Sequence, residues 1–278
     1  MARMQYKIYR RQSRRRKIRR MLLALLMLTA AIILVSRWRS LGALTVKPVI
    51  PPTATPVSAG FDQTADSRTV TLPASVWYAL QTGIYTDETA ALRTAAQYAD
   101  RGAPGYVLTQ DGKYRVLIAC YGSKDDAESV RTRLSERQSV ETYVYEWPCT
   151  EVSMQMSGMA GQLDVAEAAL SLLDDTAVQL RELAIGCDKS EYTFDEATAA
   201  VSGIMEQISL VSDTLSARFP KPLPAFVATL TSQLSQSRTL LDPLFQCETM
   251  TDFSARLKLQ SMALRQQLIA LRTLLLDM

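Results

Sequence analysis

Two polar side chains with strong hydrogen-bonding capacity stand inside apolar runs in the middle of the chain. Gln81 lies in the run VWYALQTGIY and Arg115 in the run KYRVLIACYG. An amide donates and accepts hydrogen bonds at once, and a guanidinium offers several donors in a fixed fork. Tyrosine adds a flat ring and a hydroxyl at Tyr85, Tyr121 and Tyr143. Tyr85 and Tyr121, at strand ends, either contact a ligand or lie beneath the sheet edge.

The composition argues against catalysis. The chain has no histidine, which excludes Ser-His-Asp and Cys-His catalysis, histidine metal sites and the commonest general base. Paired acids such as Asp125–Asp126 and Asp174–Asp175 fall on or beside predicted helix surfaces, where solvated charge is the ordinary explanation. We therefore expect no enzyme activity and no cofactor, and a hydrolase is poorly supported.

The four cysteines form no CxxC motif, so neither a zinc site nor a redox motif is supported. Cys187 and Cys247 lie at two predicted helix ends and would form a disulfide only in an oxidising compartment. Cys120 and Cys149 are the other pairing, although their strands are not neighbours in the expected sheet order.

Residues 76–147 contain two copies of the same predicted β-α-β unit, one after the other. Each half has an alternating strand-like run, a short acidic turn, a helix-like run and a second strand, giving the order β-α-β-β-α-β. Asp111–Gly112 between two alternating runs predicts the hairpin that joins the halves. Gly102 is expected to end the first helix, and Ser123 with Asp126 to cap the second.

This order predicts an α+β fold of the ferredoxin-like, split βαβ kind. Both helices would cover one face of a four-stranded sheet and leave the other face open. Strand alternation places Gln81, Gly83 and Arg115 on the open face, together with Tyr143 or Tyr145. Glycine at position 83 would let a ligand approach the backbone closely.

The same stretch resembles the SPOR domain family. The chain keeps the family's glutamine, first glycine, both aromatic residues and Arg-Val pair. It differs at Ala119 and Cys120, where the family usually has Gly-Pro, and at Thr82, where the family is usually apolar. The residues that carry the resemblance are Ala79 to Tyr85, followed by Ala90, and Tyr114 to Tyr121, followed by Ala127.

SPOR domains are peptidoglycan-binding modules of bacterial cell-division and sporulation proteins. The resemblance therefore implies that a SPOR-like domain over residues 75–148 binds glycan strands stripped of their stem peptides at the septum. Hydroxyl and N-acetyl groups of glycan suit an amide, a guanidinium and aromatic rings. The implied binding residues are Gln81, Gly83, Arg115, Tyr85, Tyr121 and Tyr143.

The N-terminal residues predict a membrane anchor. Residues 1–20 carry ten Lys or Arg and no acidic residue, and residues 21–35 are apolar apart from one threonine. Fifteen helical residues span only ~23 Å of a ~30 Å hydrocarbon core, and flanking arginines and a tryptophan extend the span. Because no small-x-small cleavage motif follows, we expect residues 21–38 to be an uncleaved transmembrane signal anchor rather than a cleaved signal peptide. The positive-inside rule places residues 1–20 in the cytoplasm.

Residues 39–74 predict an extended linker outside the membrane, because five prolines are mixed with Thr, Ser, Ala and Gly and no apolar periodicity holds. Residues 40–278 are expected on the extracytoplasmic side. They contain 19 basic and 28 acidic residues and are therefore net acidic. Nucleic acid is therefore not an expected partner.

Residues 151–278 predict an all-α domain, a four-helix antiparallel bundle. Apolar residues recur at three-four spacing from Leu163 to Ala184, and Gly186 is expected to end this helix. A capping box of Thr193 and Glu196 opens the second helix.

The third helix is expected at about Ala225 to Leu241, and the last is leucine-rich. The apolar stripes form either the core of the bundle or a coiled-coil surface for self-association or a protein partner, for which the last helix is the first candidate. Its stripe consists of Phe253, Leu257, Leu264, Leu268, Leu271 and Leu275.

Taken together, these features predict a single-pass bacterial envelope protein in which a SPOR-like domain binds glycan and a helical bundle supports it or recruits partners. The alternative is a membrane-tethered scaffold that acts through protein contacts of the bundle without binding glycan.

Overall fold

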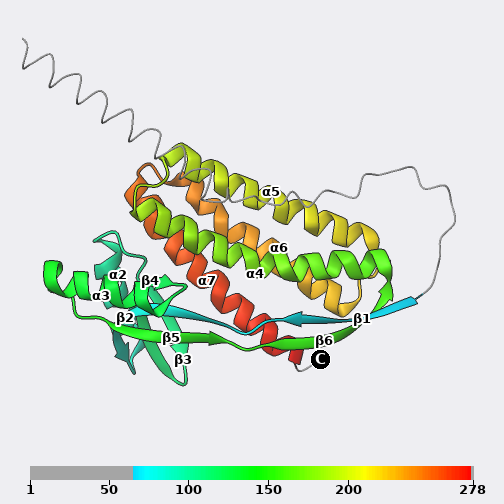
Figure 1. Cartoon of the computed structure of the whole chain (residues 1–278), viewed down its shortest axis with the longest axis horizontal. Helices are drawn as coiled ribbons and strands as arrows, with labels where there is room; N and C mark the ends of the chain where they lie inside the picture. The colour runs from blue at the N-terminus through cyan, green and yellow to red at the C-terminus, as the bar shows by residue number, and fades with distance from the viewer. Residues whose placement is uncertain (1–64, 277–278) are drawn as a thin grey trace, which may run out of the picture. The chain divides into compact units, whose positions relative to one another are not determined.

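The computed structural model of the chain describes residues 65–276, all within one compact unit (Figure 1). The predicted tail 1–20, the anchor 21–38 and residues 39–64 of the predicted linker lie outside the described residues. None of the helices between residues 65 and 276 has the length and hydropathy that a membrane crossing needs. The elements are β1 (Ala65–Leu72), β2 (Ser75–Tyr85), α2 (Glu88–Ala99), β3 (Tyr106–Gln110), β4 (Lys113–Tyr121), α3 (Lys124–Gln138), β5 (Tyr143–Cys149), β6 (Val152–Met159), α4 (Ala160–Asp188), α5 (Phe194–Arg218), α6 (Ala225–Leu241), the 3₁₀ helix η1 (Asp242–Gln246) and α7 (Met250–Leu276).

The predicted α/β module is a four-stranded antiparallel sheet in the order β3-β4-β2-β5, with α2 and α3 against one face. This is the strand order of a split βαβ fold, and the mixed α+β class is confirmed. Asp111 and Gly112 both adopt positive φ, as a two-residue hairpin turn requires. Ser123 caps α3 by accepting a hydrogen bond from the backbone N–H of Asp126.

A two-stranded ribbon of β1 and β6 extends this sheet. β1 lies within the segment predicted as linker, and β6 lies within the segment predicted as helical. β1 pairs with β6 from Ala65↔Met159 to Leu72↔Val152, and the antiparallel pairing resumes at Ser75↔Cys149 between β2 and β5. The two arms therefore form one long ribbon that runs from the sheet along the helices (Figure 1). The linker bounds of 39–74 and the helical bounds of 151–278 are corrected accordingly.

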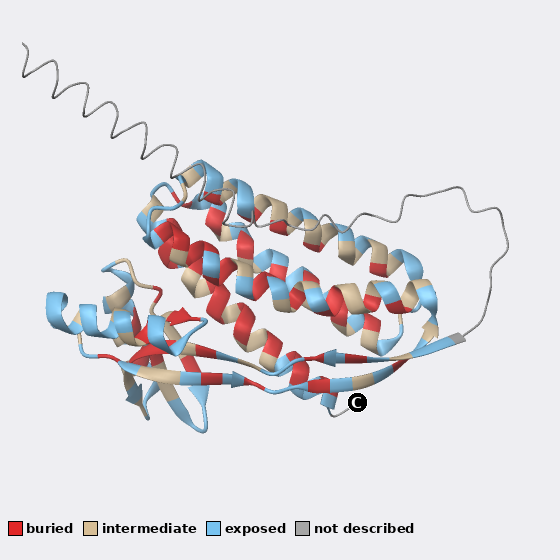
Figure 2. Cartoon of the chain, in the orientation of Figure 1, coloured by how far each residue is buried: buried red, intermediate tan, exposed pale blue. Residues whose placement is uncertain are grey.

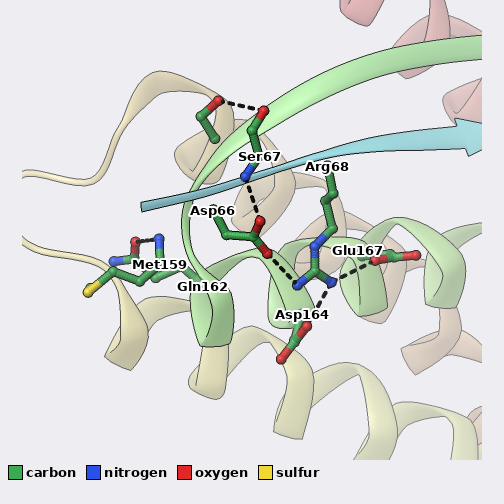
Figure 3. A network of polar contacts seen from close by, with 8 residues as sticks. Asp66, Ser67, Arg68, Met159, Gln162, Asp164 and Glu167 are labelled. Carbon is green, nitrogen blue, oxygen red and sulfur yellow. Dashed lines mark hydrogen bonds and ion pairs between the residues drawn. The ribbon is translucent and has the colours of Figure 1, made fainter. Parts of the chain in front are cut away.

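The inner face of the ribbon anchors it to α4. Val70 and Val152 are buried in the same core as the helices, and the serines and threonines between such positions face outward. At the far end, Arg68 Nη1 lies 2.8 Å from Asp164 Oδ1 and 3.3 Å from Glu167 Oε2 (Figure 3). These ion pairs are partly exposed, so burial of the apolar residues contributes most of the attachment.

The four long helices form the predicted bundle, with α4 in contact with α5, α6 and α7. The Thr193–Glu196 capping box is present at the start of α5. The prediction that Gly186 ends the first helix is wrong, because α4 continues to Asp188. Gly186 is buried, and a β-carbon there would lie 2.4 Å from the ring of Tyr192. Glycine is therefore required at position 186 because it packs against the Tyr192 ring, and not because it ends the helix.

The apolar stripes form the core of this unit. All six residues of the leucine-rich stripe on α7 are buried, as the run of buried positions along that helix shows (Figure 2). The interpretation of the stripes as the bundle's own core is therefore confirmed, and the α7 stripe is not available to a partner in this state.

Candidate binding face

The sheet has two different faces. One face meets α2 and α3 through small apolar clusters around Leu80 and Val116. The other face carries Trp77, Cys120 and Trp147, which belong to the same buried cluster as the helices of the bundle. The expectation that this second face stays open is therefore wrong at the end near the ribbon.

Two arginines from the bundle lie over Trp77. Arg181 of α4 and Arg265 of α7 place their guanidinium carbons 4.5 and 5.0 Å from the ring centroid, and Trp77 is only 2% exposed. Arg265 also donates hydrogen bonds to the Ser75 hydroxyl at 2.7 Å, the Ser75 carbonyl at 2.9 Å and the Trp147 carbonyl at 3.1 Å. Burial lowers the pKa of Arg265. This arginine joins α7 to both arms of the ribbon.

The departure from the SPOR pattern coincides with this contact. Cys120 occupies a position where the family usually has Gly-Pro, and its side chain is buried against the bundle. Burial raises the pKa of its thiol to about 12 despite nearby Arg181 and a hydrogen bond with Ser261. A small, neutral side chain at position 120 lets α4 and α7 approach the sheet closely.

The end of this face away from the bundle holds the predicted polar residues. Arg115 Nη1 donates to Gln81 Oε1 at 2.8 Å, and the Arg115 guanidinium lies 4.7 Å from the centroid of the Tyr145 ring. The Tyr145 hydroxyl donates to Gln110 Oε1 on β3. We call Gln81, Arg115, Tyr145 and Gln110 the polar cluster.

The polar cluster joins the two edges of the sheet. β3 and β5 are the edge strands, so the contact between Tyr145 and Gln110 spans the whole face. Nearer the bundle, Tyr106 on β3 and Trp147 on β5 bring their ring centroids within 6.1 Å. Contacts between the two edge strands therefore cross this face at two levels, and Gln81 on the same face is only 6% exposed.

Tyr143 is the most accessible aromatic residue at the rim of this face. It pairs with Gln81 across β2 and β5 and is 65% exposed. Ile84, opposite Arg115 on β4, is also exposed. An exposed ring beside an ordered guanidinium can stack on a flat or cyclic ligand and hydrogen-bond to it.

A β-bulge separates the remaining predicted residues from this face. The pairing of β2 with β4 shifts register between Leu80 and Gln81 and again between Gln81 and Gly83. A β-carbon at Gly83 would lie 2.9 Å from the ring of Tyr85, which contacts α2 residues on the helix-covered side. The placement of Gly83 on the face of Gln81 is therefore wrong, because the bulge reverses the alternation.

The two strand-end tyrosines also lie on the helix-covered side. The Tyr85 hydroxyl accepts a hydrogen bond from Thr94 Oγ1 of α2 at 3.0 Å. Tyr121 is 8% exposed and contacts the cluster beneath α3. Of the two alternatives for these residues, the structure shows the packed one. Gln81, Arg115 and Tyr143 are brought together, and Gly83, Tyr85 and Tyr121 are not.

Sequence reasoning missed Gln110 and Ile84. Gln110 alternates with Leu108 and Tyr106 along β3, so strand periodicity carried a signal for its face. The sheet face on which Ile84 lies depends on the β-bulge in β2, and no sequence pattern indicated that bulge.

The described residues offer no metal site. Between residues 65 and 276, no group of three or more His, Cys, Asp and Glu side chains is arranged to hold an ion. Cys120, Cys149, Cys187 and Cys247 are all buried and free, without disulfides.

Comparison with known proteins identifies the module. Residues 74–146 match the SPOR domain family. A solved structure that matches the chain is the solution structure of the peptidoglycan binding domain of the B. subtilis cell wall lytic enzyme CwlC, at 27% identity over 26% of this chain and 91% of that chain, with a TM-score of 0.23. No curated protein matches the chain. The α/β module at residues 74–146 is a SPOR domain.

Proposed function

We propose that the SPOR domain binds peptidoglycan glycan strands, with a preference for strands stripped of stem peptides. The family match of residues 74–146 carries this proposal. The polar cluster supports it, because an ordered guanidinium, amide groups and aromatic rings suit the hydroxyl and N-acetyl groups of glycan.

The accessible end of this face, at Arg115 and Tyr143, is the proposed contact region. Arg115 and Tyr143 contact the sugar directly, and Gln81 acts by orienting Arg115 because its own side chain is nearly buried. The bundle covers the end around Trp77, so only a short stretch of glycan fits. We therefore expect modest affinity per domain.

The rest of the chain serves localisation in this proposal. Residues 21–38 anchor the protein in the cell membrane, residues 1–20 stay in the cytoplasm, and residues 40–278 lie outside, where the SPOR domain directs the protein to the division or sporulation septum. The basic N-terminal residues followed by an apolar run support this arrangement. The protein acts by binding and not by catalysis.

Co-sedimentation of the full-length chain with purified peptidoglycan, intact or amidase-stripped, tests the proposal. We expect more protein to sediment with stripped peptidoglycan and expect Arg115→Ala to weaken binding. Arg93→Ala is the matched control, because Arg93 is exposed on α2 at the opposite side of the sheet. Equal sedimentation with both materials would refute the preference for stripped strands.

A second function, a membrane-tethered scaffold without glycan binding, is favoured by two observations. The bundle covers one end of the sheet face, and the contact of Tyr145 with Gln110 closes the other over Gln81. In that case a protein partner contacts the exposed surface of the bundle rather than the α7 stripe. A folded full-length chain that binds no peptidoglycan in the same assay would favour this function.

A further inference from the structure

A cleft of about 500 Å³ lies between α3 of the SPOR domain and the C-terminal end of α4. Its size falls within the range of ordinary ligand sites. It lies on the helix-covered side of the sheet, away from the polar cluster, so a ligand here is independent of glycan binding. Both the SPOR domain and the bundle contribute walls.

Three cations line this cleft without a partner. Arg133 and Arg137 stand one turn apart on α3, and Lys189 follows α4. Among residues 65–276 the structure has no ion pair or hydrogen bond to any of their side chains. By contrast, Arg131 on the same helix is paired with Glu128 at 2.7 Å.

The acidic residues of the cleft are largely neutralised. Glu182 is paired with Arg181 at 2.7 Å, and Asp188 with Lys258 at 2.6 Å. Asp126 accepts a hydrogen bond from the Ser123 hydroxyl and has no cationic partner among residues 65–276, so it is not neutralised by an ion pair. The three unpaired cations against this one carboxylate leave an excess of two positive charges.

A tyrosine hydroxyl adds a neutral donor. Tyr121 lines the cleft and is 8% exposed, and its hydroxyl has no hydrogen-bond partner among residues 65–276. Burial and the nearby Asp188 raise the pKa of Tyr121, so the hydroxyl stays protonated at neutral pH. Because the Tyr121 hydroxyl bonds to no other side chain of the described residues, it can donate a hydrogen bond to a ligand in the cleft.

The remaining wall is apolar. Val130 and Leu134 of α3 lie beside Ile185 of α4, and all three are partly buried. A ligand that combines an anionic group with a hydrocarbon part would satisfy both halves of the cleft.

We propose that this cleft binds an organic phosphomonoester. The two arginines and the lysine surround the phosphate, whose double negative charge matches the excess of positive charge. Guanidinium groups bind phosphate oxygens in bidentate fashion, and the tyrosine hydroxyl donates a further bond. The hydrocarbon part lies on the apolar wall. The source is either a lipid phosphate headgroup or a soluble phosphate.

Isothermal titration of the full-length chain in neutral detergent at low ionic strength tests this proposal. The probes are phenyl phosphate, dihexanoyl phosphatidic acid and inorganic phosphate. We expect an organic phosphate to bind more tightly than inorganic phosphate. The Arg133→Gln/Arg137→Gln double variant should weaken binding roughly tenfold or more, because charge-assisted hydrogen bonds are lost. Tyr121→Phe should weaken it severalfold, and Arg93→Gln should not change it.

The outcomes separate cleanly. Tighter binding of dihexanoyl phosphatidic acid supports the proposal with a lipid source, and equal or tighter binding of phenyl phosphate supports it with a soluble source. No binding of either organic probe overturns the proposal, as does unchanged binding by the double variant. A loss in the Arg93 control equal to that in the double variant also overturns it, because binding would then reflect general charge.

Discussion

Replacing Arg265 with methionine should weaken the attachment of the bundle to the SPOR domain. The side chain is 2% exposed and makes three hydrogen bonds of 2.7 to 3.1 Å to Ser75 and Trp147, as well as the cation–π contact with Trp77. Its loss leaves the buried Trp147 carbonyl and the partly buried Ser75 carbonyl without this donor. Each such group costs about 1–3 kcal/mol, and a desolvated cation–π contact contributes about 2 kcal/mol.

An opposing effect reduces the expected loss. Arg265 is itself desolvated, its Nε has no partner, and methionine fills much of the same volume. We therefore expect the free energy of unfolding to fall by about 2–4 kcal/mol, a large share of the ~5–15 kcal/mol typical of folded proteins.

Urea denaturation followed by circular dichroism measures this change, and hydrogen exchange in β2 and β5 localises it. Arg256→Met is the matched control on α7, because Arg256 is exposed and paired only with Asp252 at 3.3 Å. The control should change stability by less than about 0.5 kcal/mol. If Arg265→Met unfolded at the same urea concentration as the unmodified chain, the role of Arg265 in joining α7 to β2 and β5 would be refuted.

Two further predictions concern buried positions. Gly186→Ala should destabilise the chain by about 1–3 kcal/mol, because the new methyl group would overlap the Tyr192 ring. Gly203→Ala on α5 meets nothing within 4 Å and should stabilise by about 0.5–1 kcal/mol, so thermal melts that shift both variants in the same direction would contradict this account. Cys120 should resist iodoacetamide at pH 8 in the folded chain and react after unfolding, because burial raises its pKa to about 12 and thiolate forms only at far higher pH. Mass spectrometry that finds rapid labelling of the folded chain would contradict its burial.

Local signals in the sequence predicted much of this fold. The Asp111–Gly112 turn, the Thr193–Glu196 capping box and the bounds of α6 were readable because each depends on neighbouring residues. The leucine stripe of α7 was readable as core because its spacing is helical over the whole segment.

The ribbon was harder to recognise. β6 alternates Val152, Met154 and Met156 with polar residues, but methionine, serine and glutamine have little preference for strands. β1 follows a proline-rich segment that resembles a linker. Each strand is stabilised by the other, and the paired residues lie between 80 (Leu72 and Val152) and 94 (Ala65 and Met159) positions apart in the chain. No local sequence pattern indicates such a pairing.

The candidate site was predicted only in part, for a related reason. Gln81 and Arg115 were correctly placed together because simple alternation holds up to Gln81. The bulge then shifts the register by one residue, which moves Gly83 to the other face. The cover over Trp77 comes from α4 and α7, and tertiary contacts of this kind are not encoded in the pattern of either strand.

The most direct test of glycan binding at the rim is the affinity of full-length Tyr143→Ala for amidase-stripped peptidoglycan. Tyr143 is highly exposed, so its removal should leave the fold intact. Loss of ring stacking worth about 1–1.5 kcal/mol should weaken binding roughly fivefold to tenfold. Leu92→Ala removes similarly exposed apolar bulk from α2, on the opposite side of the sheet, and should bind like the unmodified chain. Equal affinities for the two variants, or no measurable binding by the folded unmodified chain, would contradict the account.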